Sequence, residues 1–167
     1  MTFEIRPVRS GEHGEAGRVT ALAYREFVGP GDSGWEEYLQ HVADVEGRAR
    51  SATVLVAVED DRILGSATLE LDGRIDDDDP PLHPEEAHIR MLGVDPQARG
   101  RGIARGLIDT CFALAEEAGR TYVTLHTTQR MKVAQAMYRA LGFERLEDRV
   151  FPDGFVLLTY RRAIPPD

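Results

Sequence analysis

The densest group of residues that could do chemistry is a glycine-rich turn that leads into a helical pattern. An apolar strand-like run precedes Gln97-Ala98-Arg99-Gly100-Arg101-Gly102, and an apolar helical stripe follows it. The first turn of a helix leaves about four backbone N–H groups without partners, and the peptide dipoles add roughly half a positive charge there. Gly100 and Gly102 have no Cβ, so an anion can approach the backbone closely. Three side chains add positive charge: Arg99, Arg101 and Arg105. The turn therefore predicts a site for a phosphate-like anion.

Two widespread phosphate-binding motifs fit this turn poorly. A Rossmann dinucleotide turn would have its third glycine where Arg105 stands, and Gly106 comes one residue late. A Walker nucleotide turn requires a G-x-x-x-x-G-K-[ST] run, which the sequence lacks. The spacing leaves two interpretations, a site for the pyrophosphate of coenzyme A and a purely structural glycine turn.

At these residues the sequence resembles the GNAT superfamily of N-acetyltransferases. The stretch Gln97-x-Arg99-Gly100-x-Gly102-Ile103-Ala104 matches the Q/R-x-x-G-x-G/A signature of that family. The resemblance continues upstream over 89–94 and downstream over 134–143. With the order of the elements included, it spans nearly the whole chain.

The resemblance implies a fold, a co-substrate and a set of binding residues. The fold is an α/β (mixed α+β) GNAT domain, with a splayed, mostly antiparallel sheet of about six or seven strands and four helices. The co-substrate is acetyl-CoA, and no metal is expected. In the family the signature loop holds the coenzyme A pyrophosphate, and the preceding strand pairs with the pantetheine arm and orients the thioester. The expected coenzyme-binding residues are Leu92, Gly93, Val94, Arg99, Gly100, Arg101, Gly102, Ile103, Ala104 and Arg105.

The acid that protonates the leaving thiolate is expected to be Tyr138. It matches the family tyrosine that faces the coenzyme sulfur. The alternative is a packing role, because Tyr138 lies four residues after Ala134 and falls on the same helix face.

The sequence leaves the identity of the general base open. Many relatives carry a glutamate at the start of the strand, and register from Val94 places His88 there, with Glu86 two residues earlier. A histidine has the more suitable ordinary pKa for a base near neutral pH. Alternation predicts that four residues share one strand face: His88, Arg90, Leu92 and Val94. His88, Glu86 acting through water, and neither residue remain open.

The surrounding pattern predicts one domain over 1–167, with strands and helices alternating. The expected strands cover 3–6, 54–58, 63–71, 87–94, 122–127, 143–151 and 155–161. The expected helices cover 14–27, 35–46, 102–118 and 132–141. These elements must position the turn, the strand before it and the helix that carries Tyr138.

Composition narrows the classes of partner. The net charge of −9 argues against nucleic acid, and no apolar run reaches the length of a membrane span. The N-terminus has no signal-peptide layout, so a cytoplasmic protein is expected. Cys111 is the only cysteine, which excludes an intrachain disulfide; a buried thiol is expected, with a nucleophile as the alternative.

The acceptor is expected to be a small-molecule amine. Trp35, Tyr38, Phe27 and the acidic run 76–79 could receive an aromatic or cationic amine, or could be core and solvated loop. A protein N-terminus or lysine is the second choice, and a non-catalytic acyl-CoA sensor is the alternative from another class. The strand at 155–160 could be an edge that pairs two subunits into a homodimer.

Overall fold

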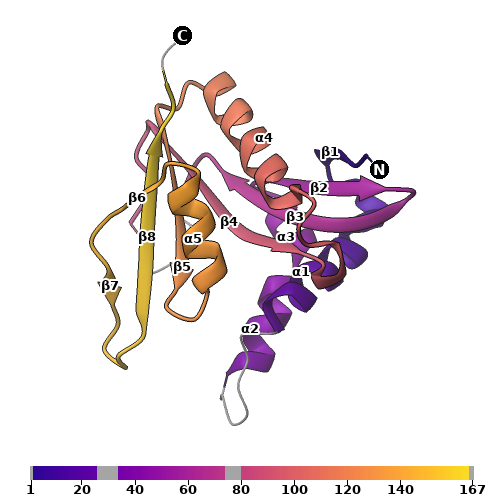
Figure 1. Ribbon diagram of the computed structural model, residues 1–167, viewed down its shortest axis with the longest axis horizontal. Helices are drawn as coiled ribbons and strands as arrows, with labels where there is room; N and C mark the ends of the chain where they lie inside the picture. The colour runs from indigo at the N-terminus through magenta and orange to yellow at the C-terminus, as the bar shows by residue number, and fades with distance from the viewer. Residues whose placement is uncertain (1, 26–33, 74–79, 166–167) are drawn as a thin grey trace. The chain divides into compact units, whose positions relative to one another are not determined.

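The computed structural model describes residues 2–25, 34–73 and 80–165, which form a mixed α/β structure (Figure 1). Within these residues there are eight strands and five α-helices, and the strand order is β1-β2-β3-β4-β5-β8-β6, with β7 paired to β8. The chain divides into two compact units, Met1–Glu70 with Arg90–Cys111, and Leu71–Ile89 with Phe112–Asp167. Phe27 and the acidic run 76–79 lie outside the described residues.

The first unit is built on an antiparallel hairpin. Strands β2 (Thr53–Glu59) and β3 (Arg62–Glu70) pair with each other, and β1 (Glu4–Pro7) pairs with β2. The hairpin turns at Asp60 and Asp61, both with positive φ (49° and 63°), as a two-residue type I′ turn requires. Polar aspartates tolerate this conformation better than branched residues do, which explains why the chain turns there.

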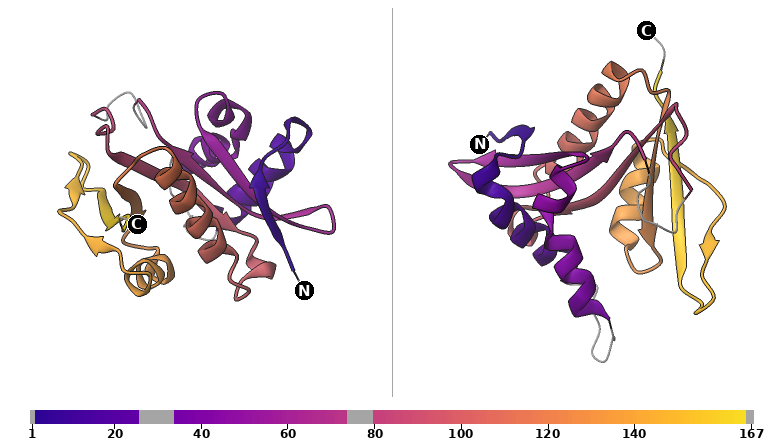
Figure 2. Two further views of the ribbon diagram at one scale, coloured as in Figure 1. Left: turned by 90° about the horizontal axis from the view of Figure 1, so that it is seen from above. Right: turned by 180° about the vertical axis from the view of Figure 1, so that it is seen from behind.

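Helices cover this hairpin. The short 3-10 helix η1 (Ser10–Glu12) leads into α1 (His13–Arg25), which packs along β3 in the views of Figures 1 and 2. The helices α2 (Trp35–Ala43) and α3 (Val45–Ala49) pack against α1. The buried cluster beneath them consists of Ala16, Val19, Val45, Val54, Val56 and Ile63.

One predicted helix is divided into two helices in the structure. The apolar spacing predicts a single helix over 35–46, but Asp44 adopts φ −80° and ψ 67°, which is not helical. Its carboxylate accepts a hydrogen bond from the Gly47 backbone N–H at 3.0 Å and thereby caps α3. Local side-chain capping therefore competes with helix continuation, and five helices result where four were expected.

The second unit is a sheet made from strands distant in sequence. The start of β4 (Glu86–Val94) pairs in parallel with β5 (Tyr122–Thr128), and β5 pairs antiparallel with β8 (Val156–Ala163). The predicted strand over 143–151 is instead two short pieces, β6 (Glu144–Arg145) and β7 (Arg149–Val150), both paired with β8. This division raises the count to eight strands from the expected six or seven.

Two helices complete the framework. Helix α4 (Ile103–Glu117) begins at the glycine-rich turn in the first unit, and its last residues belong to the second unit. Helix α5 (Lys132–Ala140) lies along one face of β5 and β8 (Figure 2). Tyr138 of α5 anchors that packing, with its ring 5.7 Å from that of Tyr160.

Candidate active site

The glycine-rich turn has the backbone geometry of an anion-binding loop. Strand β4 ends at Val94, and Asp95 caps the 3-10 helix η2 (Pro96–Ala98) by accepting from the Gln97 N–H at 2.9 Å. Gly100 and Gly102 then adopt φ of 79° and 81°, values that favour glycine. An added Cβ at either glycine would meet nothing within 4 Å, so the glycines serve the backbone conformation and leave open space beside it.

Helix α4 starts directly after this turn with its first N–H groups available to an anion. The Gly106 N–H donates to the Gly102 carbonyl at 3.0 Å, which begins the helical pattern. The first turn contains no acidic side chain that would compete for the N–H groups. Ile103 is buried and anchors the helix, whereas Ala104 is half-buried and Arg105 exposed. The loop can therefore bind a pyrophosphate through backbone donors.

The three arginines of the loop do not act alike. Arg101 forms a bidentate ion pair with Glu59 at the end of β2, and this pairing raises the pKa of the Arg101 guanidinium. Arg101 therefore fixes the loop to the hairpin, and its contact with the coenzyme stays a prediction. Arg99 and Arg105 are exposed at the loop and the helix start.

The strand before the loop departs from regular alternation. Met91 has φ 54°, a left-handed value that is uncommon for a residue with a side chain. Because alternation requires extended backbone at every position, the prediction that His88, Arg90, Leu92 and Val94 share one face fails at Met91. Gly93 packs closely: an added Cβ would lie 3.0 Å from that of Ala23. Leu92 and Val94 are half-buried beside it.

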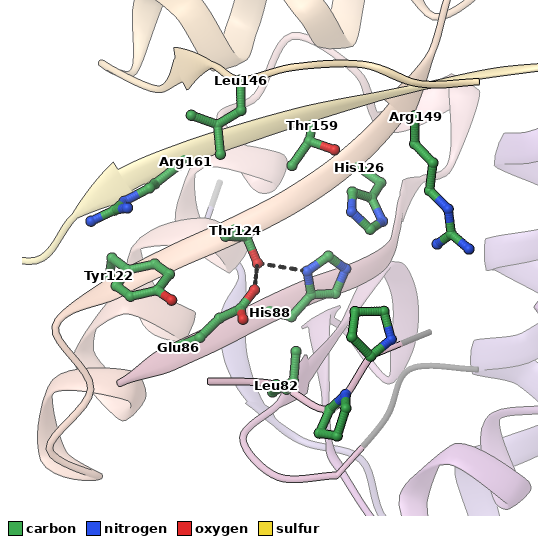
Figure 3. A pocket seen from close by; sticks show the side chains of 12 residues that line it. Leu82, Glu86, His88, Tyr122, Thr124, His126, Leu146, Arg149, Thr159 and Arg161 are labelled. Atoms are coloured by element: carbon green, nitrogen blue, oxygen red, sulfur yellow. Dashed lines mark hydrogen bonds between the residues drawn. The ribbon is translucent and has the colours of Figure 1, made fainter. Parts of the chain in front are cut away.

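In the second unit, the two candidate bases belong to one hydrogen-bonded chain (Figure 3). Thr124 Oγ1 donates to Glu86 Oε2 at 2.6 Å, and it lies 2.8 Å from His88 Nδ1. His88 is 1% exposed, and its ring centroid is 4.6 Å from that of His126. We call Glu86, Thr124 and His88 the relay.

The relay fixes the histidine tautomer. An ionised carboxylate can only accept, so the single proton of the Thr124 hydroxyl is directed to Glu86. Thr124 must then accept from His88, and Nδ1 carries the hydrogen. In the neutral ring the lone pair therefore lies on Nε2, the nitrogen that could take a proton from a substrate.

The relay lines a cavity of about 560 Å³ in the second unit. Its floor is one face of β4, β5 and β8, and its rim includes Leu82 and Leu146 (Figure 3). The remaining lining residues are Pro80, Pro81, Tyr122, His126, Arg149, Thr159 and Arg161. A cavity of this size and polarity suits a small polar molecule.

Tyr138 does not face this cavity. Its ring packs against Phe143 and Tyr160, 5.8 Å and 5.7 Å between centroids, and burial raises the pKa of its hydroxyl. Tyr160 alternates with the cavity-lining Thr159 and Arg161 along β8, so Tyr138 lies on the opposite face of this sheet from His88. The structure thus joins Glu86 with His88 and separates both from Tyr138 by the sheet.

Thr124 and His126 were not predicted as site residues from the sequence. A threonine within a β-branched strand is ordinary, and Thr124 meets His88 only through the register of β4 and β5. The period-two spacing of Thr124 and His126 along β5, matching that of Glu86 and His88 along β4, was the one available signal. Cys111 is fully buried, which raises the pKa of its thiol to about 12 and argues against a nucleophile.

Among the described residues, no group of three histidine, cysteine, aspartate or glutamate side chains could hold a metal ion. No helix of the described part of the chain combines the length and apolar character needed to cross a membrane.

A strand, a left-handed glycine loop and a helix start with available N–H groups form a site that can bind a phosphate-like anion. Comparison with known proteins identifies the class of protein, since the model of the "Acetyltransferase (GNAT) family" matches residues 18–143. The chain belongs to the GNAT acetyltransferase family. The observed fold, a mostly antiparallel open sheet with helices, agrees with the predicted GNAT fold.

Individual relatives give the range of similarity. A probable N-acetyltransferase family 8 member 5 from Mus musculus is 39% identical over 67 residues, 40% of this chain and 30% of that protein. The mycothiol acetyltransferase of Geodermatophilus obscurus is 28% identical over 144 residues, 85% of this chain and 44% of that protein. The chain therefore spans less than half the length of these curated relatives. A GNAT family acetyltransferase from Brucella melitensis, solved in complex with acetyl-CoA, has TM-score 0.68 and 22% identity, with 99% of this chain and 90% of that chain covered.

Proposed function

We propose that this protein transfers an acetyl group from acetyl-CoA to a primary amine of a small molecule, by direct attack of the amine on the thioester. The observation that carries the proposal is the loop of Gly100 and Gly102 at the start of α4. Family membership supports acetyl transfer as the class of reaction. The same family match spans parts of both compact units, which supports a single functional domain.

On the donor side, the residues present fit the coenzyme. Backbone N–H groups at the start of α4 would hold the pyrophosphate, and Arg99 and Arg105 would add positive charge beside it. Acetyl-CoA is bound in the solved Brucella melitensis relative, which has the same fold. The strand residues Leu92 to Val94 would align the thioester arm.

On the acceptor side, the reaction requires a base. A lysine-like amine has a pKa near 10.4, so about one molecule in 10³ is neutral at pH 7, a deficit of roughly 4–5 kcal/mol. His88 is suited to offset it, because the relay leaves the lone pair on Nε2. Glu86 acts in this proposal through Thr124, as the group that holds the tautomer.

The leaving group requires an acid. The Tyr138 hydroxyl carries a proton at neutral pH and is the proposed donor to the departing thiolate, although burial raises its pKa and makes that proton harder to release. As the amine nitrogen bonds to the carbonyl carbon, the carbon–sulfur bond breaks. One amine proton passes to His88 and the thiolate receives the proton of Tyr138, which requires the thioester to be accessible from both faces of the sheet that separates these two side chains.

A small molecule is favoured over a protein as acceptor by the cavity. Its volume of about 560 Å³ lies within the range of small-ligand sites, and its lining combines apolar surface with polar side chains such as His88, Thr124 and Arg161. The aromatic group of Trp35, Tyr38 and Tyr24, with Trp35 and Tyr38 5.3 Å apart, belongs to the other unit and is left without a role here.

The test is a panel of small amines, an N-terminal peptide and a lysine peptide, each incubated with acetyl-CoA and read by release of free thiol. We expect amine-dependent release that is fastest with small molecules. Release that depends only on the peptides would favour a protein acetyltransferase. Tight binding of acetyl-CoA with no release across the panel would favour an acyl-CoA sensor and overturn the proposal.

A further inference from the structure

One row of side chains crosses the floor of the cavity. His88 of β4 is paired with Thr124 of β5, and Thr124 is paired with Arg161 of β8. Residues directly opposite on neighbouring strands place their side chains on the same face. The relay histidine and Arg161 therefore point to the same side of the sheet, two strands apart (Figure 3).

Among the described residues, the cavity lining includes two arginines, Arg149 and Arg161, and one carboxylate, Glu86. Glu86 accepts the hydrogen bond of Thr124 within the relay. The guanidinium of Arg161 therefore offers the cavity a positively charged donor for a negatively charged ligand group.

Arg161 is oriented in a way that suits such a group. Its guanidinium stacks over the Tyr122 ring, 4.1 Å from the centroid. Stacking occupies the face of the guanidinium and leaves its N–H edge to bind oxygen atoms in pairs. Among the described residues, no carboxylate forms an ion pair with Arg161.

We propose that the acceptor is an amine that also carries an anionic oxygen group, carboxylate or phosphate, and that Arg161 binds this group while the amine lies at His88. This inference rests on the proposed acetyl transfer and names the substrate class of that site. The backbones of the two residues lie two strand spacings, about 10 Å, apart. A small molecule that carries both an amine and an anionic group, such as an ω-amino acid, is therefore the class of acceptor to test.

The test compares acceptors that differ only in this charge. γ-Aminobutyrate is paired with its amide, and phosphoethanolamine with ethanolamine, and kcat/KM is measured at saturating acetyl-CoA. We expect the anionic member of at least one pair to be favoured by about 10-fold or more, the usual size of a charged hydrogen bond. The pair with the larger ratio identifies the carboxylate or the phosphate as the preferred group.

Variants assign the preference to Arg161. Arg161→Gln should reduce the ratio to near one by slowing only the anionic acceptor, and Arg161→Glu should favour a diamine. Arg162→Gln is the matched control, because Arg162 lies on the opposite face of β8, 4.7 Å from the centroid of the Phe112 ring. The control should keep the wild-type ratio.

Equal kcat/KM within both pairs for the wild-type protein would overturn this inference and leave acetyl transfer intact, whatever the variants do. A wild-type preference that persists in Arg161→Gln would also overturn the assignment to Arg161. Failure of every amine to release thiol would overturn the proposed function itself, and the inference with it.

Discussion

A single hydroxyl group determines how two titratable side chains of the cavity work together. Thr124 donates to Glu86 and accepts from His88, so the carboxylate and the imidazole are joined without touching each other. The arrangement keeps the hydrogen on Nδ1 and the lone pair on Nε2. In the proposed mechanism His88 is the base and Thr124 a positioning residue.

We expect His88→Gln to lower kcat by about 10²-fold or more, the usual contribution of a general base. In the wild-type protein kcat/KM should fall as the pH drops, because a protonated imidazole cannot accept the amine proton. The variant should lose this acidic limb. An unchanged limb in a pH–rate profile would exclude His88 as the base.

Thr124→Val should reduce kcat with little change in KM for acetyl-CoA, because the Nδ1 hydrogen loses its acceptor and the tautomer is no longer fixed. Thr124→Ser keeps the hydroxyl and should restore the activity. Equal activity of the valine and serine variants in steady-state assays would show that the relay has no role.

Tyr138→Phe should lower kcat by about 10²-fold and leave the Kd of acetyl-CoA nearly unchanged, since the change removes one hydroxyl and keeps the ring packing. Tyr160→Phe is the matched control, a buried tyrosine in the same aromatic group. If the two variants lose the same modest activity, Tyr138 is a packing residue only.

Among the elements, the loop before α4 forms the proposed donor site through its backbone conformation. Gly100→Ala forces a side chain into a left-handed residue at a cost of about 1–2 kcal/mol. We expect the Kd of acetyl-CoA to rise by about 10-fold or more, because the N–H groups no longer converge on the pyrophosphate. Isothermal titration calorimetry measures this directly.

Gly119→Ala provides the control for this change. Gly119 has φ 78° and the same open surroundings, but it lies at the far end of α4. Its substitution should cost similar stability and leave the Kd unaltered. Equal loss of affinity in both variants would mean that the loop affects binding only through stability.

The join between β1 and η1 depends on a carboxylate. Glu12 accepts two hydrogen bonds of 2.8 Å from Arg6 and one of 2.9 Å from the Arg9 N–H, and these lower the pKa of Glu12 from 4.5 to about 2. A lowered pKa stabilises the fold above pH 4.5, and this stability is lost as the pH falls towards 2. Glu12→Gln should therefore lower Tm at neutral pH, by a difference that shrinks over this range in thermal unfolding followed by circular dichroism.

Sequence periodicity predicted most elements because their apolar residues recur regularly. The stripe of α4 and the β-branched run of β2 are examples. The break at Asp44 was missed because a capping carboxylate leaves the apolar spacing intact. Only part of the relay was predicted from the sequence. His88 and Glu86 are two residues apart in the sequence, whereas Thr124, which joins them, is 36 residues from His88 and lies beside it through strand register.

At the scale of the whole molecule, the net charge of the chain and the charges that line the cavity lead to different expectations about the charge of the acceptor. A net charge of −9 permits a cationic partner, while the described lining of the cavity includes two arginines and one carboxylate. Local charge governs recognition, because a cavity focuses the potential of the groups that line it. The global balance remains relevant to nucleic acid, which this chain is not expected to bind.

Direct transfer from acetyl-CoA to an amine is tested most simply by following a labelled acetyl group through the reaction. With a small amine present, we expect the label to appear in the N-acetylated amine and none on the protein, since the one thiol, Cys111, is buried with its pKa raised to about 12. Label retained on the protein before the amine is added would contradict direct attack. Absence of any labelled amine product would contradict acetyl transfer altogether.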